Sequence, residues 1–556
     1  MSAGILGISI SGLYAAQVGI RTTQQNIANV NTEGYHRQQV LQSGRLPEGA
    51  GGLYFGTGVS VDQVRRLYSQ FLDADLRQAE SQLAYNQGFI SYANRVDNLL
   101  GGEFTGLTGV LTKFFTSIDE VANDPTSLVA RRAMLSSANT LAGRMNMLGN
   151  ELYAMNATAN TEITEIARNI NAYIDRLAAL NVNLVGGDNK AAPDLLDQRD
   201  QLVSELSKLV GVRQVTQSDG SIALFTGGGQ ALLVGSTTMR IEIIDHPADP
   251  VQKTVALRAG NSVAQIDEAL IDSGRLGGVL AARREIIQFA IQDLGRIAIA
   301  LTDQFNQLHE AGYDLQGNLG QSFFLPVGGL LQHPLNHADN AGSAEFQVSL
   351  VDSSMLKSNA YRLSYDGTNY TLQMLDNAGR STGVSYTAAS LAALNPLLHA
   401  NEGFGLVLTS GTPVAADSWL VRLTASGANR FGVNISEPDR IAAASNSSSY
   451  PGDNDNALAL AALGKQADRV GNRMSYASAY ALIVGTNASL ANNAGNNVKA
   501  FEAIRQQTFD ALQGFSGVNL DEEAVNLIKY QQAYQASVKA IQVASSLFNE
   551  ILQAMR

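Results

Sequence analysis

Histidine is the first residue type to consider for catalysis or metal binding, because imidazole binds metal ions and transfers protons near neutral pH. The spacing of the histidines shows whether two of them could act together. The chain has six histidines, of which His333 and His337 lie closest together. Side chains four residues apart share a face only on a regular helix, and Pro334 between them prevents one. We therefore interpret this segment as a polar loop rather than a metal site.

A run of carboxylates and amides, Asp453-Asn454-Asp455-Asn456, has the opening pattern of a calcium-binding loop. In such loops the sixth residue is glycine and the twelfth is a bidentate glutamate. Counted from Asp453, these positions hold Leu458 and Gly464. The run is therefore interpreted as part of a turn-rich linker, and the sequence predicts no metal.

The other routes to catalysis are also poorly supported by residue type. No cysteine is present, so thiolate chemistry, disulfides and cysteine-bound metals are excluded. The glycines at positions 51, 52, 56 and 58 are not followed by the Gly-Lys-Ser/Thr of a phosphate loop. Carboxylates that meet only in space could still form an acid–base pair, although solvated surface charge is the simpler interpretation. We assign no nucleophile elbow and no cofactor, and predict that the protein is not an enzyme.

The element that dominates the chain is instead the long C-terminal stretch after Gly517, which carries a seven-residue hydrophobic repeat. Its repeating positions are Leu520, Leu527, Tyr534, Ile541, Phe548 and Met555. The positions four residues after them hold Ala524, Gln531, Val538, Ser545 and Leu552. Two such positions per heptad form a seam on one helix face, and a helix of about 35 residues would be about 50 Å long. It needs another helix to cover that seam.

The N-terminal stretch has a seam of the same period. Leu6, Leu13, Ile20 and Ile27 recur every seven residues, with Ala3, Ile10, Gln17 and Gln24 as companions. We expect the two terminal helices to pair with each other or with copies of themselves, and polar Gln17 and Gln531 to specify the register. Because nothing else in the chain obviously covers these seams, we also expect them to be largely disordered in the free monomer.

Composition limits the kinds of partner. The chain has 556 residues and a net charge of −12, which argues against a nucleic-acid surface. No apolar run approaches about 18 residues, so we expect no membrane span. The start, Met1-Ser2-Ala3-Gly4-Ile5, has no basic lead and no cleavage site, so we expect no cleaved signal peptide.

Between the ends, residues from about 69 to 209 carry helical patterns, including a long helix over 128–185 that ends at Gly186-Gly187-Asp188. Alternating apolar residues predict short antiparallel strands over 212–257, and a further helix follows over about 276–309. Long antiparallel helices with narrow apolar stripes form a rod-like domain.

A separate β domain is predicted over 328–440, where alternating runs are divided by hairpin signals such as Asp366-Gly367-Thr368-Asn369. The fold class is thus α+β and multidomain: a coiled-coil-like terminal helix pair, a long-helix rod domain with short strands, and an inserted antiparallel β domain. The predicted domains are 1–68 with 515–556, 69–327 with 441–514, and 328–440.

Two motifs resemble the bacterial flagellar axial proteins, the rod, hook and hook-associated proteins. The first is Ser11-Gly12-Leu13-Tyr14-Ala15-Ala16-Gln17 followed by the stretch from Gln25 to Gln38, which contains Asn31-Thr32-Glu33-Gly34-Tyr35. The second is Ser516-Gly517-Val518-Asn519-Leu520-Asp521-Glu522-Glu523-Ala524 with Tyr530-Gln531-Gln532-Ala533-Tyr534. Within that superfamily the first motif is most similar to the hook-associated protein 1 family of hook–filament junction proteins.

This resemblance implies a structural subunit of the extracellular flagellum that joins hook to filament by helical polymerisation through its ends. It implies self-assembly in a helical ring and contacts with hook protein and with the second junction protein, hook-associated protein 3. It also implies export without a cleaved signal, with an export chaperone on the C-terminal helix. The residues assigned to assembly are Leu6, Ile10, Leu13, Gln17, Ile20, Asn26, Ile27, Asn29, Gly34, Leu520, Leu527, Gln531, Tyr534, Val538, Ile541 and Phe548.

Two alternatives stay open at this point. The chain could be an adhesin or host-interaction protein that uses the β domain, or that domain could contain a hydrolase. The first would require binding that deletion of residues 328–440 removes while motility remains. The second would require a concave cluster of polar residues.

Overall fold

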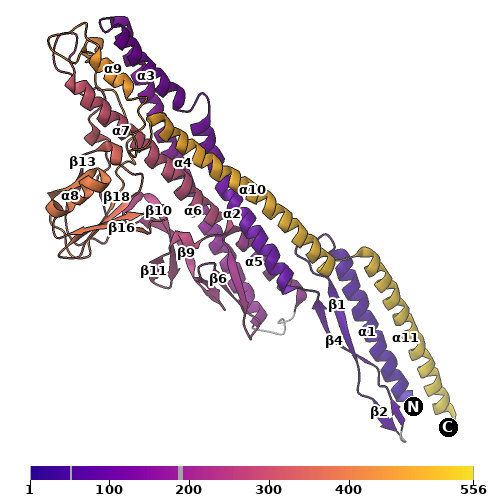
Figure 1. The fold of residues 1–556 in the computed structure, drawn as a ribbon. Helices are drawn as coiled ribbons and strands as arrows, with labels where there is room; N and C mark the ends of the chain where they lie inside the picture. Colours follow the sequence, from indigo (N-terminus) through magenta and orange to yellow (C-terminus); the bar gives the residue numbers. More distant parts are fainter. Residues whose placement is uncertain (1, 51–52, 186–191, 555–556) are drawn as a thin grey trace. The chain divides into compact units, whose positions relative to one another are not determined.

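The computed structural model describes residues 2–50, 53–185 and 192–554 (Figure 1). They form two compact units, each assembled from segments that are distant in sequence. The terminal unit comprises Met1–Leu83, Ile170–Met239 and Lys499–Arg556, and the central unit comprises Ala84–Asn169 and Arg240–Val498. Met555 and the predicted helix stop at 186–188 lie outside the described residues.

The terminal unit begins with a helix, continues with two hairpin-like strand pairs and ends with another long helix. Its helices are α1 (Ser2–Ala28), α5 (Pro193–Leu209) and α11 (Leu520–Ala554), with parts of α2 (Gln70–Gly101), α4 (Leu128–Val185) and α10 (Tyr476–Ser516). Strand β1 (Gln38–Gly44) pairs antiparallel with β4 (Val59–Arg66), and β2 (Glu48–Ala50) pairs with β3 (Leu53–Phe55). The segment after the first helix is therefore a hairpin.

A small sheet of the terminal unit packs beside the end of α4. Its order is β5-β6-β7-β8, from strands β5 (Val212–Thr216), β6 (Ile222–Thr226), β7 (Ala231–Val234) and β8 (Thr237–Thr238). The buried Asn181 amide of α4 donates to the carbonyl oxygens of Ile222 and Gly235 at 2.8 Å each. It also accepts from the Ile222 amide at 3.1 Å, so one side chain satisfies backbone groups of the sheet.

The central unit has a helical part built around phenylalanine rings. Its elements are α3 (Thr108–Asn123), α6 (Gly274–Ala282), η2 (Arg283–Gln288), α7 (Phe289–Ala311), α9 (Asp455–Ala462) and the larger parts of α2, α4 and α10. Phe114, Phe305, Phe323 and Phe324 are fully buried, and the Phe305 and Phe323 ring centroids are 4.9 Å apart. The predicted helix over about 276–309 is present, but a π-helical stretch, η2, interrupts it.

The strands of the central unit form three antiparallel sheets. The first has order β11-β10-β9, from β9 (Arg240–His246), β10 (Asp249–Ala259) and β11 (Ser262–Gln265), and is followed by the short helix η1 (Glu268–Leu270). The second has order β12-β18-β14-β15-β16, from β12 (Leu335–Asn336), β14 (Tyr361–Tyr365), β15 (Tyr370–Leu375), β16 (Ser381–Ala388) and β18 (Ser418–Val421). The third pairs β13 (Glu345–Leu350) with β17 (Phe404–Ser410). Trp419 of β18 is buried, and its ring centroid lies 4.7 Å from that of Phe346 of β13.

One helix in the predicted β domain was not expected from the sequence. Helix α8 (Leu391–Glu402) contains Pro396 and ends at Gly403, whose φ of 74° is the left-handed conformation of a helix C-terminus. Its last residue, Glu402, is fully buried and accepts hydrogen bonds from Tyr361 at 2.6 Å and Tyr386 at 2.8 Å. A buried carboxylate with phenolic donors thus fixes this helix on the sheet.

The α+β class, the pairing of the terminal helices and the antiparallel sheets are confirmed. The expectation of disordered ends is not what the described residues show, because both ends are helical and packed on each other. The predicted division into terminal, rod-like and outer β domains stays a prediction. Among the residues described, no helix is long and apolar enough to cross a membrane.

Gly295 of α7 should be intolerant of any side chain. A Cβ there would lie 1.7 Å from the Thr424 carbonyl oxygen, which belongs to backbone that cannot yield easily. We expect Gly295→Ala to lower the free energy of unfolding of the central unit by about 2 kcal/mol or more, as overpacking does. Gly143→Ala in α4, where nothing lies within 4 Å, should instead raise it by about 0.5–1 kcal/mol. Denaturant unfolding checks both, and equal effects would contradict the packing.

Candidate functional site: the paired terminal helices

Helices α1 and α11 lie side by side and run antiparallel, with both chain ends at the same end of the pair (Figure 1). Three contacts give the register. Asn26 bonds to Glu523, Gly19 lies against the Tyr530 ring, and Gly12 faces Ser537. Each contact is seven residues from the next on both helices, so the pair has the heptad period that the sequence predicted.

Small residues, not large ones, form the contact on α1. A Cβ on Gly19 would lie 2.5 Å from the Tyr530 ring, and one on Gly12 would lie 3.1 Å from the Ser537 hydroxyl. The buried side chains of α1 are Ser9, Ser11, Ala15, Ala16, Thr22, Thr23 and Asn26. The absence of bulk at these positions lets the two backbones approach closely.

The predicted seam of α1 is therefore out of phase by one residue. Leu13, Ile20 and Ile27 directly follow the contact positions and are half-buried, while Leu6, Ile10 and Gln17 are exposed. Counting large apolar residues gave the correct period, but the face that contacts α11 holds glycine, alanine, serine and threonine instead. Ile10 is 51% exposed, which leaves it available to another molecule.

On α11 the predicted seven-residue spacing is correct but its companion positions are not. Leu527, Tyr534 and Ile541 are half-buried. The residues that accompany them lie three positions after each heptad position rather than four, and they are Glu523, Tyr530, Ser537 and Ala544. Gln531 is exposed and Val538 is half-buried, while Leu520 and Phe548 are each 51% exposed.

Asn26 is the centre of a polar junction where α1 ends and the hairpin begins. Its amide nitrogen donates to the Gln38 carbonyl and to Glu523 Oε2, each at 3.0 Å. Its amide oxygen accepts from the Gln38 backbone at 2.9 Å and from the Tyr35 hydroxyl at 2.8 Å. Burial, with nearby acidic groups, raises the pKa of Tyr35, so its hydroxyl stays a donor.

Arg37 completes this junction by joining it to the start of α11. Its guanidinium donates to Glu523 at 2.8 Å and to Glu522 at 2.6 Å, and its backbone amide donates to the Ser516 carbonyl at 2.9 Å. The Glu523 side chain is 2% exposed. From the sequence, Glu522 and Glu523 were named only as part of the second motif, and neither Arg37 nor Glu523 was among the residues assigned to assembly. Their presence in the two quoted motifs was the available signal.

The turn between Asn26 and Arg37 positions this arginine. Asn29 is half-buried and closes the helix end, since its amide donates to the Gln25 carbonyl at 3.0 Å and it accepts from Thr32 at 3.1 Å. Gly34 has a φ of 77°, a conformation that side chains disfavour, and Gln201 of α5 lies 3.5 Å from where a Cβ would be. These two predicted residues therefore shape the turn rather than line the helix pair.

A second charged cluster holds the hairpin on α5. His36 lies 2.8 Å from Asp197 through Nδ1, and Arg66 of β4 bonds to Asp197 at 2.7 Å and to Asp200 at 2.5 Å. The guanidinium also stacks 4.3 Å from the Tyr68 ring centroid. The hairpin is thus fixed at its base to α5 and along its length to α1, where Ser11 accepts from the Val59 amide at 3.2 Å.

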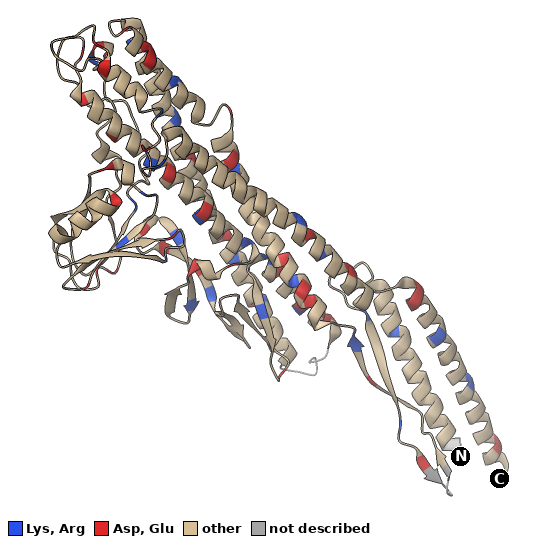
Figure 2. Cartoon of the chain, in the orientation of Figure 1, with Lys and Arg blue, Asp and Glu red and all other residues tan. Residues whose placement is uncertain are grey.

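The helix pair exposes many apolar side chains, and its two helices differ in charge, since α11 carries Asp521, Glu522, Glu523, Lys529, Lys539 and Glu550. Arg21 is the only charged residue of α1, which is almost entirely tan in Figure 2. The exposed large apolar residues are Ile5, Leu6, Ile8, Ile10 and Tyr14 on α1 and Leu520, Val525, Ile528, Val543, Leu547, Phe548, Ile551 and Leu552 on α11. We call this set the exposed apolar face. Its extent is typical of a surface that another protein covers.

The side chains that the sequence suggested for metal binding make hydrogen bonds typical of turns. His337 Nδ1 accepts from the Asp339 amide at 3.3 Å, and Asp453 accepts from the Ser445 and Asp455 amides at 2.8 and 3.0 Å, as a turn aspartate does. Within the described residues no group of three or more His, Cys, Asp or Glu side chains could hold a metal ion.

One pattern was overlooked in the sequence. Residues Gly379 to Gly383 have the Gly-x-Ser-x-Gly spacing, although no nucleophile elbow was assigned. Ser381 begins β16, which lies at the edge of an antiparallel sheet, and its hydroxyl accepts from the Gly383 amide at 3.1 Å. A nucleophile elbow joins a strand to a helix, so this serine does not have the required setting.

Comparisons with known proteins agree with the two motifs. A family model described as the flagellar hook-associated protein FlgK helical domain matches residues 93–324, and one described as the flagellar basal body rod FlgEFG protein C-terminal matches residues 513–554. Flagellar hook-associated protein 1 of Salmonella typhimurium is 34% identical, and that of Escherichia coli is 31% identical, each over 99% of both chains. The flagellar hook junction protein FlgK from Burkholderia pseudomallei superimposes with a TM-score of 0.70 at 24% identity, covering 80% of this chain and all of that one.

The glycine contact predicts a sharp difference between two substitutions in α1. Gly19→Ala places a methyl group 2.5 Å from the Tyr530 ring, so we expect the helix pair to lose about 1–3 kcal/mol. Gly7→Ala, with nothing within 4 Å, should stabilise α1 by about 0.5–1 kcal/mol. Amide hydrogen exchange of α1 and α11 measures both. Unchanged protection in Gly19→Ala would mean that the register is different.

Two adjacent glutamates that bind the same arginine provide a matched pair. Glu523→Ala removes the buried carboxylate that accepts from both Arg37 and Asn26, so we expect a loss of about 2 kcal/mol or more in the stability of the helix pair. Glu522→Ala removes a carboxylate whose side chain is 57% exposed and should cost less than about 1 kcal/mol. Denaturant unfolding, read through exchange protection of α11, checks this order. A larger loss in Glu522→Ala would contradict it.

Proposed function

Because this chain belongs to the flagellar hook-associated protein 1 family, we propose that copies of it assemble through their paired terminal helices at the junction of hook and filament. It is a structural, non-enzymatic component of the extracellular bacterial flagellum, a hook–filament junction protein. What is proposed here is the route of assembly: helical polymerisation by head-to-tail contacts, with the helix pair toward the inside of the tube.

The exposed apolar face is the single observation that carries this proposal. Ile10, Tyr14, Val525 and Ile528 are each more than half exposed, although α1 and α11 already pack on each other. The intramolecular pair thus buries the small residues of α1 and leaves these four large ones largely outside. This arrangement supports packing between copies better than packing within one.

The free energy gained by covering the exposed apolar face is comparable to the cost of association. Full burial of a Leu, Ile or Phe side chain contributes about 1.5–3 kcal/mol, so covering one that is half exposed contributes about 1 kcal/mol. Eight large apolar residues of α11 and five of α1 are exposed among the described residues. Covering them can offset the roughly 4–15 kcal/mol that association costs in lost freedom.

The same face suits several partners in succession. We propose self-assembly in a helical ring, with hook protein on one side of that ring and hook-associated protein 3 on the other. Before assembly, an export chaperone would cover α11, where Val543, Leu547 and Phe548 would otherwise be exposed to water. The sixteen residues assigned to assembly from the sequence keep that role as a proposal, with the half-buried ones acting through the helix pair.

A charge on the outer face should prevent assembly without unfolding the chain. Phe548→Asp places a carboxylate at a position that is 51% exposed in the monomer and buried in the proposed assembly. We expect normal circular dichroism and thermal melting, but no polymers in sedimentation and electron microscopy. A deletion strain carrying this variant should form hooks without filaments and release flagellin into the medium.

Asn549→Asp is the matched control, since it adds the same charge at the neighbouring exposed position without removing an apolar side chain. It should polymerise and support motility to a much greater extent than Phe548→Asp. Filaments of normal number and attachment in the Phe548→Asp strain would refute assembly through this face. Loss of the monomer fold would instead be visible in the melting curve.

A further inference from the structure

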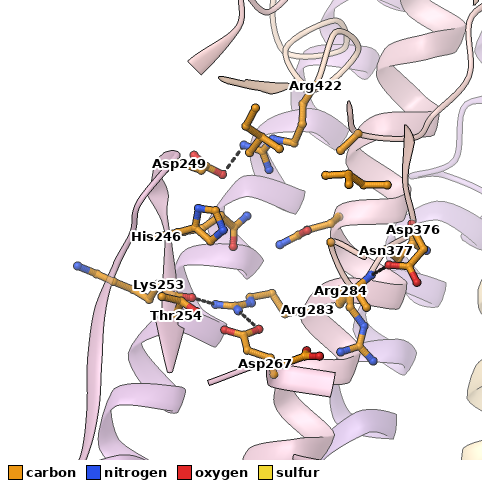
Figure 3. Close-up of a pocket in the computed structure, with 18 of the residues that line it drawn as sticks. His246, Asp249, Lys253, Thr254, Asp267, Arg283, Arg284, Asp376, Asn377 and Arg422 are labelled. Carbon is orange, nitrogen blue, oxygen red and sulfur yellow. Dashed lines mark hydrogen bonds and ion pairs between the residues drawn. The ribbon is translucent and has the colours of Figure 1, made fainter. Parts of the chain in front are cut away.

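The central unit contains a polar cavity of about 190 Å³ that has no part in the proposed assembly (Figure 3). Its wall is formed by β10, η1, the π-helical η2, and the turn after β15 with Asp376 and Asn377. One water occupies about 30 Å³ in the liquid, so this volume has room for several waters or one small ligand.

The charged groups in this wall already neutralise one another. Each of its three arginines has a carboxylate partner. The pairs are Arg283–Glu268 at 2.7 Å, Arg284–Glu285 at 2.5 Å and Arg422–Asp249. Burial lowers the pKa of His246, which therefore adds no charge at neutral pH. With Lys253, Asp267 and Asp376 included, the lining holds four basic and four acidic side chains, so it offers no net attraction to an ion of either sign.

Several polar atoms of the wall nevertheless have no hydrogen-bond partner among the described residues. Arg283 Nε is an unused donor, and Gln252 Oε1 and Gln292 Oε1 are unused acceptors. These three residues are each more than nine-tenths buried. Glu268 Oε1 and Arg422 Nε are unused as well. Buried polar atoms without partners cost free energy, so this many around one cavity indicate an occupant that both donates and accepts.

The donor at Arg283 is held in place before any ligand arrives. Its Nη1 donates to Asn160 Oδ1 and to the Lys253 carbonyl, each at 2.7 Å, and its Nη2 donates to Glu268 at 2.7 Å. With both terminal nitrogens fixed, the direction of Nε is fixed too. Arg283 also begins the π-helical stretch, and π-helical turns within α-helices occur frequently at functional sites.

We propose that this cavity binds a small, uncharged polyhydroxyl molecule of the size of one monosaccharide or cyclic polyol. A hydroxyl group can accept from Arg283 Nε and donate to the glutamine oxygens, and a ring of hydroxyls does both in several directions. Neither an anion nor a cation has this property, and the paired arginines and carboxylates leave no net charge for one to neutralise.

Binding of D-glucose, D-galactose, D-mannose and myo-inositol to the full-length protein tests the proposal, by saturation-transfer NMR and calorimetry. At least one of the four should bind saturably with a dissociation constant of about 2 mM or lower, since a dozen heavy atoms contributing about −0.3 kcal/mol each give about −3.6 kcal/mol. Sodium sulfate and 1,3-diaminopropane serve as anionic and cationic probes and should not compete.

Gln292→Leu replaces the side-chain amide by methyl groups and removes an unused buried acceptor, so the variant should fold and melt about as well as the native protein. We expect it to bind the sugar at least tenfold more weakly. Gln347→Leu, at an exposed position of β13, is the matched control and should bind normally. The proposal is overturned if no sugar or inositol binds, if Gln292→Leu binds equally well, or if sulfate or the diamine binds in their place.

Discussion

A carboxylate removed from water requires donors that stay in place, and Glu523 obtains them from the opposite end of the chain. Asn26 and Arg37 both bond to it, while Arg37 also bonds to the backbone of Ser516. The end of the first helix, the start of the hairpin and the start of the last helix are thereby fixed at one point. Once that point is fixed, the heptad spacing determines which residues of α1 and α11 face each other along the rest of the pair.

Because the two helices approach closely, small and large side chains of α1 lie in different places. Gly12 and Gly19 allow close contact inside the molecule, whereas Ile10 and Tyr14 of the same helix remain more than half exposed. In a helix pair built in the opposite way, the large apolar side chains would already be buried between the two helices. Binding another copy would then bury little further apolar surface. In the proposed assembly, the stability of the monomer and the contacts between copies therefore depend on different faces of the same helices.

The sequence allowed the period, the pairing of the ends and the fold class to be predicted, because repeats and turn signals are local properties. It did not give the phase of the α1 seam, since hydrophobicity alone rates Leu13 above Gly12. It also missed α8, where Pro396 argues against a helix, and the π-helical η2, which depends on tertiary packing. Glu523 was visible only as an acid near a helix start, because its partners lie almost five hundred residues away. The cavity beside Arg283 could not be foreseen at all, as its wall combines segments from more than a hundred residues of chain.

The near absence of charge on α1 bears on how its contacts respond to the surroundings. Ionic screening acts only on charged pairs, so seawater and fresh water should affect contacts made by this helix almost equally. Contacts of this kind weaken in the cold, because the apolar driving force is largely entropic near room temperature. In the proposed assembly, the contacts that α1 makes would therefore depend on temperature more than on salinity.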